Sequence, residues 1–210
     1  LTNLVSLNCG NNDELTSVTL TNLTSLEEFS VIGNVSGNAV SSSKLTSLNL
    51  SGLPNLTKLN CSYGILTSLN LTGLSSLTEL NCSSNFLTSL NLTNLPNLEL
   101  LDCSRNNISS LDVTDLTNLL ELTCANAYIV DGQYSGQLSS LNVAGLANLK
   151  KLNCNLNLLS SLDLTGLISL EELSCDGVPN NLGQLTSLNV NNLTNLRTLS
   201  CNFQQLTSLN

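Results

Sequence analysis

The chain has 210 residues, and its 15 acidic residues outnumber 6 Lys and Arg to give a formal net charge of −9 at pH 7. This balance argues against nucleic-acid binding, which relies on clustered cations that release counterions from the phosphate backbone. The sequence also has no apolar run of about 18 residues, the length at which a membrane-spanning helix is suspected.

One sequence unit repeats along the whole chain. Between Leu66 and Cys124 it occurs almost three times in succession, and Cys82, Cys103 and Cys124 mark its 21-residue period. Such a period is typical of solenoids, in which each unit packs only on its neighbours. We therefore predict about nine coils in a single domain over 1–210. Because the sequence begins and ends inside a unit, we expect it to be part of a longer protein.

Each coil contains two short apolar segments, with the patterns LxxLxxLxC and LTSLNL. Apolar and polar residues alternate in both, which is typical of half-buried strands. Asn, Asp or Gly recurs between them, for example Gly73 and Asn94, and these residues tolerate the left-handed backbone that turns require. No stretch has the length or composition of a convincing helix. The pattern predicts a β-rich solenoid with a parallel sheet and little or no helix.

Three insertions lengthen the regular unit. They lie near 33–44, 125–137 and 177–184. Each falls between the first and the second segment of its coil, so all three are expected to leave the same edge of the solenoid. Insertions confined to one edge often mark a binding face in repeat proteins.

The insertion at 125–137 carries three candidate ligand-binding residues, Tyr128, Asp131 and Tyr134. Tyr suits a binding loop because it supplies a broad contact area at low entropic cost. The alternative is that neighbouring apolar residues fasten the loop to the rim while the tyrosines cover it.

Four further large side chains could contact a ligand from the rim of the sheet: Tyr63, Phe86, Arg105 and Phe203. Tight protein interfaces usually contain Trp, Tyr or Arg anchors. The predicted inner face of the sheet is otherwise polar with mixed charge, as an ordinary solvated surface would also be. A shallow, weak or carbohydrate-type contact fits this composition better than a tight protein interface.

The eight cysteines occupy one position of the repeat: Cys9, Cys61, Cys82, Cys103, Cys124, Cys154, Cys175 and Cys201. Stacked coils would place them in one column with a spacing of about 4.8 Å, whereas a disulfide needs Cβ atoms about 3.5–4.5 Å apart and a twisted geometry. We predict a buried ladder of free thiols that act as small apolar side chains, and Val31 at the same position supports this. A metal cluster is the rival hypothesis, but without His or a CxxC pair we expect no metal and no cofactor.

An Asn column follows the cysteines by three residues, at Asn12, Asn34, Asn85, Asn106 and Asn157. We expect each side-chain amide to bond backbone groups of the next coil that strand pairing leaves open. The column is interrupted at Gly64, Ala127, Val178 and Gln204.

These residues carry a family resemblance. The pattern LxxLxCxxNxL, as in Leu77 to Leu87, is the leucine-rich-repeat signature with Cys in one Leu position. With its 21-residue period, the chain resembles the cysteine-ladder branch of the bacterial internalins over its whole length. The resemblance implies a secreted or cell-surface protein that adheres to a protein or glycan on a host or neighbouring cell, or to a partner subunit.

Catalysis is not expected, because the chain has no His to act as a general base and its thiols lie in the predicted core. Two other functions stay open. The chain could be a structural spacer that presents a module outside 1–210. It could also bind ice or carbohydrate through outward polar ladders, such as the one that begins with Ser68, Asn70 and Thr72.

Overall fold

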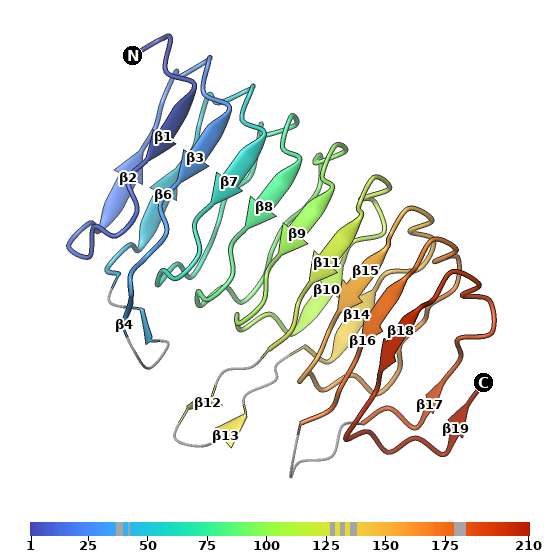
Figure 1. The fold of residues 1–210 in the computed structure, drawn as a ribbon. Coiled ribbons are helices and arrows are strands. Elements are labelled where there is room, and N and C mark those ends of the chain that lie inside the picture. The colour runs from blue at the N-terminus through green and yellow to red at the C-terminus, as the bar shows by residue number, and fades with distance from the viewer. Residues whose placement is uncertain (37–39, 42, 127–128, 131–132, 135–137, 179–183) are drawn as a thin grey trace.

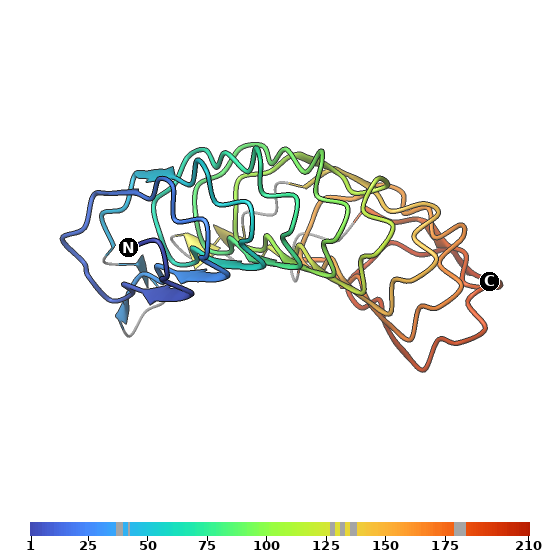
Figure 2. The ribbon, with the colours of Figure 1, turned by 90° about the horizontal axis from the view of Figure 1, so that it is seen from above.

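The computed structural model is a curved solenoid whose coils stack side by side from the N-terminus to the C-terminus (Figures 1 and 2). The structure describes residues 1–36, 40–41, 43–126, 129–130, 133–134, 138–178 and 184–210. No helix long and apolar enough to cross a membrane occurs among these residues.

The first segment of every coil contributes one strand to a nine-stranded sheet. These strands are β1 (Ser6–Asn8), β3 (Glu28–Ser30), β7 (Lys58–Asn60), β8 (Glu79–Asn81), β9 (Leu100–Asp102), β11 (Glu121–Thr123), β15 (Lys151–Asn153), β16 (Glu172–Ser174) and β18 (Thr198–Ser200). All neighbours are parallel, and equivalent positions face each other, as in the pairing of Leu59 with Leu80 and of Leu80 with Leu101. The predicted parallel solenoid of nine coils is confirmed.

The second segment forms strands in only part of the chain. Short two-stranded sheets pair β2 (Ser17–Thr19) with β6 (Ser47–Asn49), β10 (Ser110–Asp112) with β14 (Ser140–Asn142), and β17 (Ser187–Leu188) with β19 (Ser208–Leu209). The prediction of a strand is wrong at Leu66–Leu71 and at Leu87–Leu92, which contain none. Figure 2 shows the nine-stranded sheet on the inside of the arc and the second segments on its outside. Neighbouring outer segments still touch there, since the Phe86 amide donates to the Leu66 carbonyl at 2.9 Å and the Asn107 amide to the Leu87 carbonyl at 2.8 Å, but these bonds do not continue into a strand ladder.

Two of the insertions form antiparallel hairpins, β4 (Val35–Ser36) with β5 (Val40–Ser41), and β12 (Ile129–Val130) with β13 (Gln133–Tyr134). In Figure 1 both hairpins project from the edge at which the strands of the large sheet end. The described parts of these two insertions therefore leave the solenoid on one side, as the sequence predicts.

The core is a continuous stack of Leu side chains between the two faces. Each coil repeats the same inward positions, and Leu26, Leu56, Leu77 and Leu98 are all inaccessible to solvent. Phe29 replaces Leu in one coil and is also buried. Because each apolar layer is covered only by its neighbours, stability arises from coil stacking rather than from one central core.

Turns with left-handed backbone recur at two places of the repeat, although Asp115 and Asn192, which occupy the first place in their coils, do not have positive φ. At the first, φ is positive at Asn22, Gly52, Gly73, Asn94, Gly145 and Gly166, as the residue types predict. The second place lies two residues after the cysteine position. There φ is positive at Asn11, Tyr63, Ser84, Arg105, Leu156 and Phe203, all in coils without an insertion.

Candidate binding surfaces

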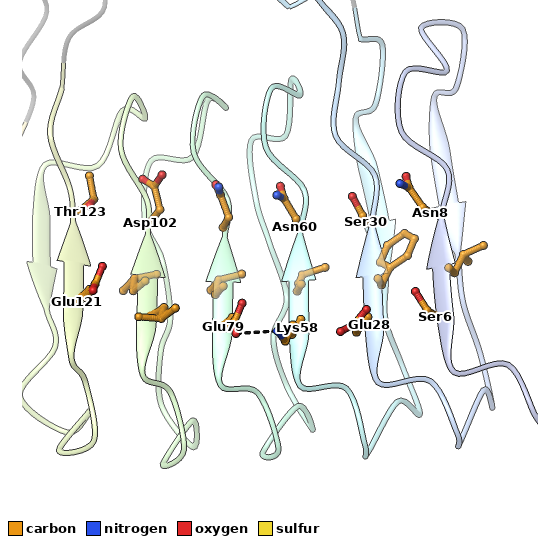
Figure 3. Close-up of a pocket in the computed structure, with 17 residues that line it drawn as sticks. Ser6, Asn8, Glu28, Ser30, Lys58, Asn60, Glu79, Asp102, Glu121 and Thr123 are labelled. Carbon is orange, nitrogen blue, oxygen red and sulfur yellow. Dashed lines mark ion pairs between the residues drawn. The ribbon is translucent and has the colours of Figure 1, made fainter.

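The inner face of the solenoid contains a groove of about 510 Å³ over β1, β3, β7, β8, β9 and β11. In each of these strands the middle residue, such as Leu59 or Leu80, points into the core, and the residues on either side of it face the groove. Figure 3 shows these flanking side chains as two rows that cross the strands. The alternation within each strand therefore produces the groove lining directly.

The first row is charged and nearly symmetrical about its centre. It reads Ser6, Glu28, Lys58, Glu79, Leu100, Glu121, Lys151, Glu172 and Thr198. Lys58 lies 3.0 Å from Glu79, and Lys151 lies 3.5 Å from Glu121. The hydrogen bond and the charge of Glu79 raise the pKa of Lys58. Leu100 is the apolar centre between two Glu–Lys–Glu triplets, and Glu exceeds Lys by two in the row.

The second row is polar, and its side chains close turns at the strand ends. The Oδ1 atoms of Asn60 and Asn81 accept hydrogen bonds from the backbone amide and hydroxyl of the Ser two residues later, at 2.7–3.1 Å. Asp102 does the same with Ser104. The Nδ2 groups of Asn60 and Asn81 have no protein partner in the part of the chain that the structure describes. They are therefore available as donors to a ligand, while the Oδ1 atom of each side chain is held by its hydrogen bonds to Ser.

The Asn column bonds the preceding coil, so its predicted direction is wrong. Nδ2 of Asn85 donates to the Cys61 carbonyl of the coil before it at 2.9 Å and to the Cys82 carbonyl of its own coil at 3.1 Å, and its Oδ1 accepts from the Leu66 amide at 3.0 Å. Asn106 repeats this arrangement one coil further on. These side chains are buried and tie each turn to the coil that precedes it.

The column has one functional substitute and one incomplete site. Gln204 stands where Asn is missing, yet it donates to the Cys175 carbonyl at 2.7 Å and accepts from the Leu185 amide at 3.1 Å. The longer side chain thus reproduces the Asn contacts. Asn157 donates to two carbonyls, but its buried Oδ1 has no partner among the described residues.

A second set of Asn side chains joins the coils at the opposite turns and was missed in the sequence. Their Nδ2 groups donate to a backbone carbonyl of the preceding coil at 2.7–3.0 Å, from Asn55, Asn97, Asn118, Asn148 and Asn195. The available signal was the recurrence of Asn immediately before the second Leu of LxxLxxLxC. Both Asn sets are structural, because their Nδ2 groups donate to acceptors within the solenoid.

All eight thiols are free. The six between Cys9 and Cys201 lie in the core with 0–6 % exposure: Cys61, Cys82, Cys103, Cys124, Cys154 and Cys175. Burial raises the pKa of Cys61, Cys103 and Cys175 to about 12. Cys9 and Cys201 are only partly buried. The interior thiols are therefore neutral at physiological pH and are poor nucleophiles or metal ligands.

Stability is expected to fall as the pH rises from about 9 toward about 12. The folded-state pKa of these thiols lies above the unfolded value of about 8.5, so their contribution is complete below that value and is lost as the pH passes through the folded pKa. Urea midpoints measured across this range, together with thiolate absorbance, test the expectation. Absorbance of eight thiolates in the native chain near pH 9 would contradict it.

The structure places the predicted ligand-binding residues in two groups. Tyr63, Phe86 and Arg105 follow the first strands of three successive coils, at the edge that lies between the two hairpins, and Phe203 occupies the same edge in the last coil. Phe86 and Phe203 are exposed, at 44 % and 55 %. Tyr134 belongs to β13, whereas Tyr128 and Asp131 lie outside the described residues.

The outer face does not form the flat continuous ladder that an ice-binding surface would need. Ser68, Asn70 and Thr72 belong to a segment without a strand. Asn70 instead accepts a hydrogen bond from the Thr72 amide at 3.0 Å, which makes a tight turn of this segment. The recurring LNLT sequence is thus explained by turn formation.

Comparison with known proteins identifies the architecture. Neither a protein-family model nor a curated protein matches the chain. Among solved structures, it resembles the functional domain of InlJ from Listeria monocytogenes, which includes a cysteine ladder, with TM-score 0.67 and 29% identity over 100% of this chain and 46% of that one. The chain thus spans less than half the length of that structure.

Two more distant similarities concern the fold alone. A TLR13–ssRNA13 complex matches with TM-score 0.62 and 24% identity over 98% of this chain and 35% of that one. The leucine-rich-repeat domain of APL1 matches with TM-score 0.56 and 18% identity over 94% of this chain and 58% of that one.

Proposed function

We propose that this chain, a leucine-rich-repeat solenoid similar to the cysteine-ladder internalins, is a non-catalytic binding domain of a secreted or cell-surface bacterial protein. Its ligand is a protein or glycan on a host or neighbouring cell. The observation that carries the proposal is the groove on the inner face, whose lining combines fixed polar groups with an apolar centre at Leu100.

The groove suits an extended polar ligand. Parallel strands repeat their side chains about every 4.8 Å, so Asn60, Asn81 and Asp102 offer two amide donors and a carboxylate at regular spacing. Their turn hydrogen bonds hold them in place, which lowers the entropy lost on binding. The Glu excess in the neighbouring row favours a ligand with donor or cationic groups.

Replacing Leu100 with Lys tests the groove. The new cation would lie between Glu79 and Glu121, which are its partners in the sheet register, so the fold should tolerate it. It would also fill the apolar centre of the groove. We expect binding of the fluorescently labelled domain to cells of a mammalian and bacterial panel to fall by about tenfold or more, a loss typical of an interface hot spot.

Ile168→Lys is the matched control, because Ile168 is 57 % exposed and does not line the groove. It introduces the same charge and should leave binding unchanged. Equal binding by both variants would contradict a groove function. Absence of binding by the unmodified domain across the whole panel would instead favour the structural spacer.

A further inference from the structure

Large side chains occupy strained positions along one edge of the solenoid. The left-handed backbone two residues after the cysteine position suits Asn, as at Asn11, but φ is also +58° at Tyr63 and +53° at Arg105. For residues other than Gly, Asn and Asp this conformation costs roughly 1–2 kcal/mol. Backbone strain of this kind concentrates at functional sites. Backbone preference therefore does not explain the choice of Tyr and Arg.

The aromatic residues of the chain are concentrated at this edge. The sequence contains three Tyr, three Phe and no Trp. Phe29 lies in the core, whereas Tyr63, Phe86 and Phe203 lie in turns at the edge, and Tyr134 belongs to the β12–β13 hairpin that leaves it. Tyr and Arg are the residues most enriched in interface hot spots, and Phe86 adds exposed apolar area.

The two hairpins border one stretch of this edge. We name this stretch, which consists of Tyr63, Ser84, Phe86 and Arg105, the aromatic edge. At one end, a Cβ added to Gly33 would clash with the Tyr63 carbonyl oxygen, so the chain entering the first insertion passes directly against the Tyr63 backbone. At the other end, the Arg105 amide donates to the Ala125 carbonyl at 3.0 Å, at the start of the second insertion. The coils of β7, β8 and β9 lie between the two hairpins (Figure 1).

The charge of the aromatic edge differs from that of the molecule as a whole. The chain carries a net charge of −9, and Lys44, Lys58, Lys151 and Arg197 each form an ion pair with a Glu. Arg105 has no ion-pair partner among the residues the structure describes. It is only half-buried, so its guanidinium can pair with a carboxylate from outside.

We propose that the aromatic edge docks a protein segment that combines an apolar side chain with a carboxylate. The apolar side chain packs on Phe86 and Tyr63, and the carboxylate pairs with Arg105. The three coils place these groups within about 10 Å of each other along the stack, since neighbouring strands lie about 4.8 Å apart. This surface lies outside the groove of the proposed function, so a result that refutes one of the two proposals does not refute the other.

The test uses three substitutions whose new residue the chain itself employs at a comparable turn. Tyr63→Asn and Arg105→Asn follow Asn11, and Phe86→Asn follows Asn107, which occupies the same position of the next coil. Because Asn tolerates positive φ, the triple variant should unfold at a urea concentration equal to or above that of the unmodified chain. That result would show that these side chains are not kept for stability. A lower midpoint would overturn the argument from strain.

The binding probe is a phage-displayed random dodecapeptide library selected on the immobilised chain. We expect enriched peptides with Asp or Glu near Leu, Phe or Trp, whose affinity, measured by fluorescence anisotropy, falls at least tenfold in the triple variant and is unchanged by Leu100→Lys. No enrichment, basic peptides, or binding lost only with Leu100→Lys would overturn the proposal. The last outcome would assign the peptides to the groove.

Discussion

Replacing Asn85 with Ala is expected to lower the free energy of unfolding by about 3 kcal/mol. The side chain is 5 % exposed and satisfies the Cys61 and Cys82 carbonyls and the Leu66 amide. Ala would leave these groups buried without partners, and each such loss costs about 1–3 kcal/mol with partial relaxation. Because the bonds join two coils, their loss also weakens the nearest-neighbour contact on which a solenoid depends.

Asn12→Ala is the matched control for this measurement. Asn12 has the same place in the repeat, but it is exposed and bonds only carbonyls of its own first coil. Equilibrium urea unfolding of both variants should show a loss of well under 1 kcal/mol for Asn12→Ala, because water can replace its bonds. Similar losses in the two variants would mean that the link between coils is not what makes the Asn column important.

The repeat predicted the inner sheet well because the same short-range pattern of burial and strand pairing recurs in every coil. A pattern such as Leu77, Leu80 and Cys82 buries the same side chains in the same register each time, so one interpretation applies nine times. The outer segments followed their alternating pattern only in part. Leu66–Leu71 has the same alternation as Ser47–Asn49 but is joined to its neighbours by isolated backbone bonds, whereas each outer pair that forms, such as β2 with β6, includes a coil with an insertion. Alternation alone therefore does not specify a strand there.

The candidate surfaces were only partly predictable for a related reason. The groove residues follow from strand alternation, but their free donors depend on which amide atom closes a turn, as at Asn60. The sequence singled out Tyr63, Phe86 and Arg105 by residue type. The strained backbone of Tyr63 and Arg105 was not predictable, because Tyr and Arg carry no signal for positive φ. The role of Gln204 was likewise hidden, since its extra methylene suggested an interruption of the column.

The cysteine column gives a second large expected effect, at Cys82. Its side chain is inaccessible to solvent and lies beside Cys61 and Cys103 in the register of β7, β8 and β9. Cys82→Ser changes size little but places a hydroxyl among apolar groups and thiols, and we expect a loss of about 2 kcal/mol. Cys82→Val should cost less than about 1 kcal/mol, because Val31 already occupies this position with 5 % exposure.

Urea unfolding of the two Cys82 variants separates an apolar ladder from a redox or metal-binding one. If the column acts only through apolar packing, the urea midpoint of Cys82→Val must be higher than that of Cys82→Ser. If the sulfur itself is required, both variants must lose stability equally.

Alkylation with iodoacetamide at pH 8 provides an independent check on the same column. Only Cys9 and Cys201 should react in the native chain, since the other six thiols are buried and protonated. All eight should react after unfolding without reductant, and any smaller number would reveal disulfides that an apolar ladder does not contain.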